Sequence, residues 1–585
     1  MNAERLLQHY ERIADAPDAI ARLRRFILDL AVRGKLVPQD SKDEPASELL
    51  KRIAKEKARL VKAGELRKPR DLEGGNELNE LFPIPATWKW VRLDAVGAII
   101  GGGTPSAADP DNFTDPGQGV PWLTPADLGG YSDLYISRGS RDLSEKGSRS
   151  SSATVMPKGT VLFTSRAPIG YVAIAANPVS TNQGFKSIVP YIPDCSRFIA
   201  TAMKAFAAEI DAKASGTTFK EVSGKIVAAV PFPLPPLAEQ HRIVAKVDEL
   251  MGLCDRLEAA RAGREAVRDR LAAASLARLN APDSETFQAD ARFALDALPA
   301  LTTRPDQIKA LRQTILNLAV RGKLVQQDPN DEPASELLKR IARKRAALLK
   351  AGYPNPEEAR AQLKKLAEQL VPDGLDALPF GWSWATLLQC SALVIDCKNK
   401  TAPYASSGIR LIRTTNVRDG QMNLNDQKYV DQKTYEVWSA RCTPEPGDIL
   451  ITREAPMGEV CLIPPGETIC LGQRMMLARL VPETIDRHFM IYSLRDPRLM
   501  DRVQDKPIGA TVQHLRVGGV ETLLVPLPPL AEQRRIVAKV DALMVLCDRL
   551  EASLTITAAT RRRLLDALLA EALAPADIAE MEAAE

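Results

Sequence analysis

The sequence lacks the short motifs by which many enzymes are recognised. Its 585 residues contain no GxxxxGKS or GxxxxGKT loop to hold a nucleotide phosphate, no HExxH pair to bind zinc, and only four histidines. The methyl-transfer signature, Asn or Asp before Pro-Pro and an aromatic residue, is also missing. The glycine cluster GGGTPS at 101–106 predicts a tight loop, and the DQK triplets at 426 and 431 are too short to indicate a nuclease. We therefore predict no catalytic residues, no cofactor and no metal site in this chain.

Membrane, export and disulfide signals are equally scarce. No apolar run approaches the ~20 residues that span a bilayer, and the amino terminus lacks a basic patch followed by an apolar core. We therefore expect a cytoplasmic protein. Eight cysteines are scattered without a CxxC pair, which is typical of buried or incidental thiols. The net charge of +4 and the pI near 8.5 are modest, so any DNA contact would need a partner to supply further cations.

What the sequence does contain is two duplicated segments. LPPLAEQHRIVAKVDELMGLCDRLEA at 234–259 returns at 527–552 with three differences in 26 positions, and LAVRGKLVPQDSKDEPASELLKRIA at 30–54 returns at 318–342 with three differences in 25. A repeat period of about half the chain indicates a duplication rather than a solenoid. The basic face of the helix predicted after Pro45 is more typical of a solvated or partner-facing surface than of a DNA reader.

Hydrophobic periodicity changes along the chain and predicts five segments. Helical spacing in the first segment gives way near Pro83 to short β-prone runs, such as WKWVRL, VPWLT, TVLFTS, YVAIAA and SIVPYI, with one helix near 196–210. The cycle then repeats. We predict an α+β fold of two similar globular domains, separated by long antiparallel coiled-coil-like helices, with an internal two-fold pseudo-repeat. The predicted boundaries are 1–82 (helical), 83–235 (α+β), 236–377 (helical), 378–527 (α+β) and 528–585 (helical).

Heptad spacing follows each Pro-Pro pair. Ile243, Val247, Leu250, Cys254 and Leu257 step by 4, 3, 4 and 3 residues, and Ile536, Val540, Leu543, Cys547 and Leu550 do the same. We expect these stripes to pack one long helix against the other, or against other helices of the repeat. The polar positions between them are then predicted to bind a partner or to cover the helix surface: Glu239, Gln240, Arg242, Lys246, Glu532, Gln533, Arg535 and Lys539.

The two α+β segments are related but diverged. PKGTVLFTSRAPIGYVAI at 157–174 aligns with PGDILITREAPMGEVCLI at 446–463, where scaffold positions agree and polar positions differ. Loops rich in amides, hydroxyls and cations can distinguish base edges. For each residue ordinary loop polarity remains the alternative. The net charges of the segments are small, +2 for 84–233 (14 basic, 12 acidic) and +1 for 380–526 (17 basic, 16 acidic).

The candidate DNA-binding residues lie in both segments. In the first they are Thr104, Ser106, Arg166, Asn182, Gln183, Lys186, Thr217, Thr218 and Lys220. In the second they are Lys398, Lys400, Arg413, Thr415, Asn416, Arg418, Arg453, Gln473, Arg474, Gln513, His514 and Arg516.

The ordered set PWLTPADL, GGTPS, SRAPIG, TNQGF, SGTTFKEVSG and PLPPLAEQHRIVAKVDEL resembles the specificity subunits of type I restriction-modification systems. The resemblance covers nearly the whole chain. It implies two target-recognition domains that each read half of a bipartite DNA sequence, and helices that dock two methyltransferase subunits. Those partners would supply S-adenosylmethionine binding and adenine methylation, while a separate restriction and motor subunit would cleave DNA. The helical block 1–80, repeated at 308–375, departs from family members that begin nearer the first recognition domain, so no role beyond docking is carried over to it.

Two other functions remain open on the sequence. One is a structural scaffold whose duplicated helices gather protein partners without reading DNA, and an adjacent methyltransferase gene would count against it. The weaker one is a self-contained nuclease or methylase, which turnover by the purified chain alone would establish.

Overall fold

The structure is a computed structural model and describes residues 15–64, 80–166, 168–215, 220–280, 285–496, 498–500, 503 and 514–573. The chain divides into two compact units, a first unit of residues 1–265 with 558–585 and a second of 266–557. Both divisions fall inside helices of 44 residues, α9 (Leu237–Asn280) and α18 (Leu530–Leu573). Each helix follows a Pro-Pro pair, as predicted, because proline cannot donate to a sheet but suits a first helical turn. No helix among the described residues is long and apolar enough to cross a membrane.

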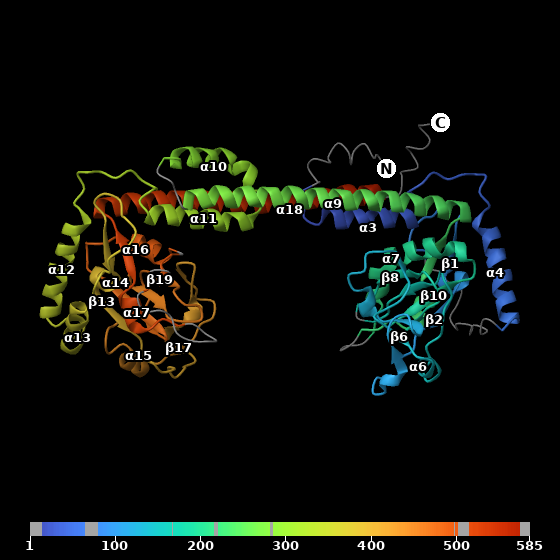
Figure 1. Ribbon diagram of the computed structural model, residues 1–585, viewed down its shortest axis with the longest axis horizontal. Coiled ribbons are helices and arrows are strands. Elements are labelled where there is room, and N and C mark those ends of the chain that lie inside the picture. The colour runs from blue at the N-terminus through green and yellow to red at the C-terminus, as the bar shows by residue number, and fades with distance from the viewer. Residues whose placement is uncertain are drawn as a thin grey trace. The chain divides into compact units, whose positions relative to one another are not determined.

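The first unit contains an α+β body (Figure 1), and most of its strand pairs are antiparallel. Its five-stranded sheet has the order β2 (Gly97–Gly101), β10 (Lys186–Pro190), β7 (Val161–Phe163), β8 (Val172–Ala175) and β5 (Tyr135–Ile136). A four-stranded sheet has the order β3 (Phe113–Thr114), β6 (Arg141–Leu143), β4 (Val120–Leu123) and β9 (Ser180–Thr181), and β1 (Lys89–Arg92) pairs with β11 (Pro231–Leu234). The five quoted runs are therefore confirmed as strands β1, β4, β7, β8 and β10.

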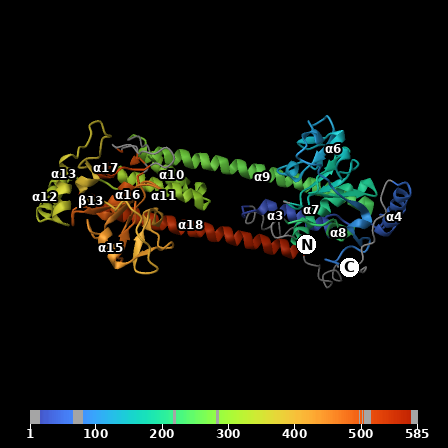
Figure 2. The same cartoon turned by 90° about the horizontal axis from the view of Figure 1, so that it is seen from below.

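Helices cover this body on two sides. α7 (Ser196–Ala212) confirms the predicted helix and packs on β7 and β8. α4 (Ala46–Lys62) lies along its side (Figures 1 and 2). The shorter helices are α5 (Leu93–Val96), α6 (Glu145–Arg149), α8 (Gly224–Ala228) and the 3-10 turns η1 (Pro110–Asn112), η2 (Pro125–Leu128) and η3 (Pro193–Cys195).

The second unit repeats this plan. Its sheets are β13 (Ser391–Asp396), β21 (Met475–Leu480), β18 (Ile449–Thr452) and β19 (Val460–Leu462); β17 (Tyr429–Val430), β14 (Ile409–Ile412) and β20 (Ile469–Leu471); β12 (Ser383–Thr386) with β22 (Leu524–Leu527); and β15 (Val417–Arg418) with β16 (Gln421–Met422). Its helices are α12 (Ala334–Lys350), α13 (Pro356–Ala367), α14 (Leu387–Cys390), η4 (Thr414–Asn416), α15 (Gln432–Trp438), α16 (Arg487–Leu494) and α17 (Val517–Glu521). The parallel pair β4–β9 recurs as β14–β20 in the same place of the chain order, so the two bodies share one topology.

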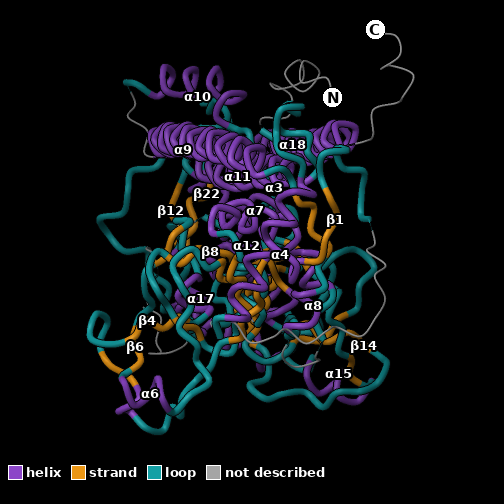
Figure 3. The backbone as a smooth tube through the Cα atoms, turned by 90° about the vertical axis from the view of Figure 1, so that its right-hand side faces the viewer, coloured by secondary structure: helices purple, strands orange, loops and turns teal. Residues whose placement is uncertain are grey.

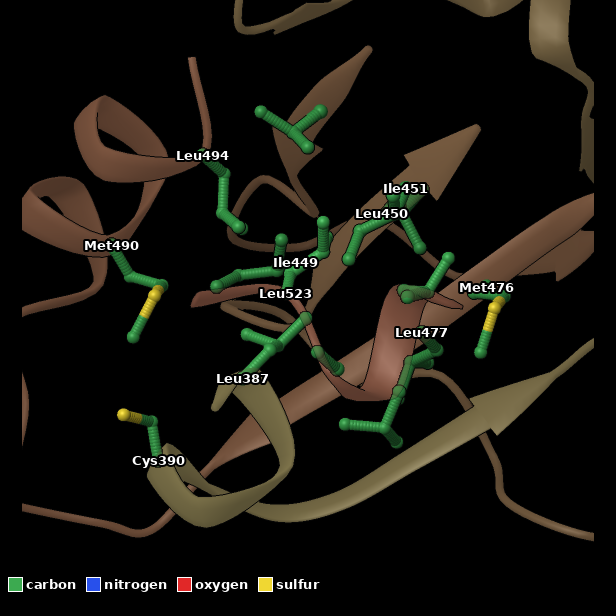
Figure 4. Close-up of a cluster of buried hydrophobic side chains, with 14 of the residues drawn as sticks. Leu387, Cys390, Ile449, Leu450, Ile451, Met476, Leu477, Met490, Leu494 and Leu523 are labelled. Carbon is green, nitrogen blue, oxygen red and sulfur yellow. The ribbon is translucent and has the colours of Figure 1, made fainter. Parts of the chain in front are cut away.

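The core of the second body is formed by strands and short helices together. Figure 4 shows Leu387, Leu450, Leu477 and Leu494 converging from α14, β18, β21 and α16, and each is at most 2% exposed. Burying a leucine side chain contributes roughly 1.5–3 kcal/mol. These buried leucines therefore give the second body a hydrophobic core of its own.

The apolar stripe of each long helix packs on shorter helices of its own unit. In the first unit Ile243, Val247 and Cys254 of α9 share a core with Ile27 and Ala31 of α3 (Ala19–Val32), together with α7. The heptad stripe of α9 therefore packs on the shorter helices of the same repeat, which was one of the two predicted arrangements. Heptad spacing defines an apolar stripe without naming the surface that covers it.

The equivalent stripe of α18 behaves in the same way. Ile536, Val540 and Cys547 pack against Ile308 and Ile315 of α11 (Pro305–Val320) in the second unit. The far end of each long helix completes the other unit: Leu565 and Leu568 of α18 contact α3 in the first unit, and Asn280 of α9 bonds to α11 in the second. α10 (Phe287–Leu301) precedes α11. Figure 3 shows the helices in purple and the strands in orange.

Candidate nucleic-acid interface

We use "loop end" for the loops in which the candidate DNA-binding residues gather, at one end of the sheets in each body. In the first body β2, β7 and β9 run into these loops, and residues 220–223 join them. Gly102 and Gly103 lie against neighbouring backbone, because an added Cβ would come within 1.8 Å of the Asn182 carbonyl oxygen and 2.3 Å of the Ala153 amide nitrogen. The GGGTPS cluster is therefore a tight loop packed on its neighbours, as predicted.

Several first-body candidates contact one another there. The Thr104 hydroxyl donates to Oε1 of Gln183. The Asn182 side chain accepts from the Gly184 amide at 2.9 Å and shapes the turn. Lys186 donates to the Gln183 carbonyl at 3.3 Å. These residues come from two loops far apart in the sequence, and the fold brings them to one place.

Glu221, an acidic residue outside the predicted set, organises this cluster. Arg166 bonds to Glu221 at 2.6 Å, and Lys186 approaches the same carboxylate at 3.4 Å. The hydrogen bond from Arg166 lowers the pKa of Glu221. Glu221 therefore fixes the orientation of two candidate cations. Ser106 and Lys220 are exposed beside them, and Thr217 and Thr218 lie outside the described residues.

The second body has an equivalent loop end with different charges. Arg453 donates from Nε to the Leu515 carbonyl at 2.9 Å, which brings it beside His514 and Arg516. Arg474 is exposed and forms an ion pair with Glu454. Lys398 lies 4.8 Å from the centroid of the Trp438 ring, Lys400 and Thr415 are exposed, and Gln513 lies outside the described residues.

Three further candidates form a turn of their own. Asn416 is 2% exposed, accepts from the Arg413 amide at 3.0 Å, and donates to the carbonyls of Asn423 and Asp426. Arg413 pairs with Asp426, and Arg418 donates to the Thr414 and Val417 carbonyls. Asn416 therefore holds the loop from inside, because its amide is occupied by backbone groups and shielded from solvent.

The strand register shows where the two loop ends differ. The β18–β19 hairpin repeats the β7–β8 hairpin: the hydroxyls of Thr164 and Thr452 donate to the Pro168 and Pro456 carbonyls at 2.8 and 2.6 Å. Two residues after each threonine stand Arg166 in one body and Glu454 in the other. The same position thus carries opposite charges on the same frame.

The predicted partner-binding positions need a correction. Glu239, Gln240, Glu532 and Gln533 are at most 1% exposed, so they cannot present their side chains to a partner in this structure. Glu239 accepts from Trp88 Nε1 at 2.9 Å and from Gln39 Nε2 at 2.5 Å. We name Gln39, Trp88 and Glu239 the first anchor.

The second unit has the same arrangement. Glu532 accepts from Trp382 Nε1 at 3.0 Å and from Gln327 Nε2 at 3.2 Å, and these three residues are the second anchor. Gln240 and Gln533 donate to the carbonyls of Pro235 and Pro528 at 3.0 and 2.9 Å. The LAEQ segments are residues 237–240 and 530–533. Their glutamates and glutamines therefore bond to buried indole, amide and carbonyl groups, which would be costly to leave without a partner.

The cations of the same segments are more accessible. Arg242 binds Asp43 and Arg535 binds Asp331, at 2.7 and 2.6 Å, with roughly a third of each arginine side chain exposed. Lys246 pairs with Glu249 at 2.9 Å on the helix surface. Lys539 is exposed. Of the eight predicted partner-binding residues, these four reach the surface.

Among the described residues no group of three or more His, Cys, Asp or Glu side chains is placed to hold a metal ion. All eight cysteines are buried thiols. Burial raises the pKa of Cys195 to about 12, which suppresses its thiolate.

The fold and the loop ends thus define a class of protein: one duplicated α+β frame presents two differently charged polar surfaces on a shared helical scaffold. The family model of the type I restriction modification DNA specificity domain matches residues 85–262 and 396–558. The specificity subunit of the type I restriction enzyme EcoAI from Escherichia coli is 30% identical over 94% of this chain and 93% of its own length. That of EcoEI, also from Escherichia coli, is 28% identical over 95% and 94%.

The HsdS subunit from Thermoanaerobacter tengcongensis, known from a crystal structure, is 20% identical with a TM-score of 0.40, covering 84% of this chain and 98% of that one. The match to the family model and the relatives of similar length show the family of this chain. It belongs to the family of type I restriction-modification DNA specificity subunits, and its part in such a system is DNA specificity rather than catalysis.

Proposed function

We propose that residues 84–233 and 380–526 each recognise one half of a bipartite DNA target through their loop ends. The observation that carries this proposal is the reversal of charge between Arg166 and Glu454 at one position of one frame. Two surfaces built on the same strands but with different polar groups suit two different base sequences. The five segment boundaries predicted from the sequence remain a prediction within this proposal.

The partners follow from the duplication. Two nearly identical scaffold segments support docking of two methyltransferase subunits, one beside each anchor, with the restriction and motor subunits joining through that complex. The half-buried Lys246 and the exposed Lys539 occupy equivalent positions on α9 and α18 and are candidates for this contact. S-adenosylmethionine would then be bound by the methyltransferase subunits, and the complex would act in the cytoplasm.

Exchange of the two bodies tests the proposal. Residues 380–526 would replace residues 84–233, and the resulting chain would be expressed with its methyltransferase in a host that lacks other adenine methylation. Single-molecule sequencing would read the methylated sequence. We expect a symmetrical target in which both halves match the half read by the second body. An assembled complex that still methylates the original target would contradict the proposal.

A further inference from the structure

A threonine and a glutamine form the same contact at both loop ends. The Thr104 hydroxyl donates to Oε1 of Gln183, and the Thr401 hydroxyl donates to Oε1 of Gln473 at 3.3 Å. The two glutamines are equivalent in the fold. In the first body the Asn182 amide donates to the Leu123 carbonyl at the end of β4, and in the second the Gly472 amide donates to the Ile412 carbonyl at the end of β14. Each glutamine is the next residue.

The surroundings of this shared pair are different. Gln183 has Arg166, Lys186 and Glu221 nearby, whereas Gln473 has Arg474 and Glu454. Gln183 is exposed and Gln473 is half-buried, and neither amide nitrogen has a hydrogen-bond partner among the described residues. If the two bodies read different half-sites, the side chains that differ between the bodies contact the base pairs that differ between the half-sites. The side chains that both bodies share then contact a base pair that the half-sites have in common.

The hydrogen-bonding groups of the threonine–glutamine pair match those of adenine. A glutamine amide can accept from N6 and donate to N7 of adenine at the same time. A threonine hydroxyl on Oε1 uses one of two lone pairs, and so fixes the amide while leaving an acceptor and two donors available. We infer that Gln183 and Gln473 each read an A·T pair, one in each half-site, and that Thr104 and Thr401 are positioning residues. This inference rests on the proposed function of the loop ends.

The test uses the chain assembled with its methyltransferase. Methylated sequences would be determined in cells, and initial methylation rates measured on duplexes in which each position of the target is replaced in turn. Gln183→Ala should abolish the preference for A·T at one position of one half-site, a loss of about 5- to 150-fold in the rate ratio. Gln473→Ala should do the same in the other half only, so each variant is the control for the other.

Three further variants separate base contact from structure. Gln183→Arg should shift the preference at the same position toward G·C, because arginine pairs with guanine. Thr104→Val should weaken the preference at that position, and Thr104→Ser should restore it, since serine keeps the hydroxyl. A structural role alone would not change the preferred base.

The inference is overturned if the relaxed position is not an A·T pair, if both halves relax together, or if methylation falls equally for every sequence, as loss of a phosphate contact would cause. It also fails if the glutamine variants leave the target unchanged while exchange of the bodies alters it. In that last case the proposed function stands. If neither change affects the target, the proposed function itself fails.

Discussion

Removing the carboxylate of the first anchor should destabilise the first unit. Glu239→Ala leaves the indole N–H of Trp88, a residue only 2% exposed, without an acceptor, and it also frees the Gln39 amide. A buried donor without a partner costs about 1–3 kcal/mol, and the lost side chain adds a cavity at the start of α9. We therefore expect a loss of about 2–4 kcal/mol in the free energy of unfolding.

The assay is urea denaturation followed by tryptophan fluorescence, with hydrogen exchange to locate the change. Exchange should accelerate in peptides from 237–250 for Glu239→Ala and in peptides from 530–543 for Glu532→Ala. Lys539→Ala is the control, because surface substitutions usually change stability by less than about 0.5 kcal/mol. If Glu239→Ala unfolds like the parent chain yet loses its methyltransferase subunit, the anchor interpretation is refuted and the earlier partner-binding prediction stands.

The same residue gives a pH dependence. Burial raises the pKa of Glu239 above its ordinary value, so the folded chain binds this proton more tightly than the unfolded chain. The contribution of this carboxyl to stability is therefore largest below the ordinary pKa and declines as pH rises through the raised value. Glu239→Gln keeps an acceptor for Trp88 and does not titrate. Its stability relative to the parent chain should increase with pH over that window, and a constant difference would contradict the burial argument.

Three other predictions concern different parts of the chain. Arg345→Met should cost about 2–3 kcal/mol in thermal denaturation, since Arg345 is 9% exposed and donates to the Gln389 carbonyl at 2.6 Å; an unchanged midpoint would contradict this. Seven residues inserted into both α9 and α18 should lengthen the gap of the methylated target by about 3 base pairs, at 1.5 Å per helical residue, and an unchanged gap would mean that these helices do not set it. The native chain should react with none of its thiols in Ellman's assay near pH 8, whereas all eight should react after denaturation.

The repeated frame could be predicted because its signals are local. Strand and helix runs follow from residue periodicity, and the Pro-Pro pairs mark the starts of α9 and α18 without any tertiary information. The gathering of the candidate loops at one end was not predictable, because successive strands of an antiparallel sheet send their loops to opposite ends and only the strand order decides which loops meet. The ion pairs at that end were not predictable either. Glu221 and Glu454 decide how the cations lie, and an acidic residue gives no sign of this in a search for DNA contacts.

The burial of the LAEQ segment was missed for a related reason. Polar residues at the start of a helix usually face solvent, so the sequence predicts a partner-binding or helix-surface position for Glu239 and Gln240. A usable signal was nevertheless present in the repeat. Where the two copies differ, His241, Arg534, Glu249 and Ala542 are exposed, while the buried glutamates and glutamines are unchanged. Positions that differ between the copies thus indicate the surface of the frame, whereas unchanged positions include both the buried glutamates and exposed residues such as Lys539.

The anchors also explain why two separate segments are duplicated together. Gln39 and Asp43 belong to one repeated segment, Glu239 and Arg242 to the other, and the structure bonds each glutamate and arginine to its counterpart. Neither segment can change alone without leaving a buried group unpaired. The tryptophan that completes each anchor lies inside the body, and Trp88 and Trp382 pack edge-on against Phe198 and Phe489 at centroid distances of 6.1 and 6.3 Å. A body transplanted with its own tryptophan and phenylalanine therefore brings the donor that the resident glutamate requires. The anchor thus permits exchange of one loop end for another. The repeated segments supply the glutamate and glutamine of the anchor, and the exchanged body supplies the tryptophan.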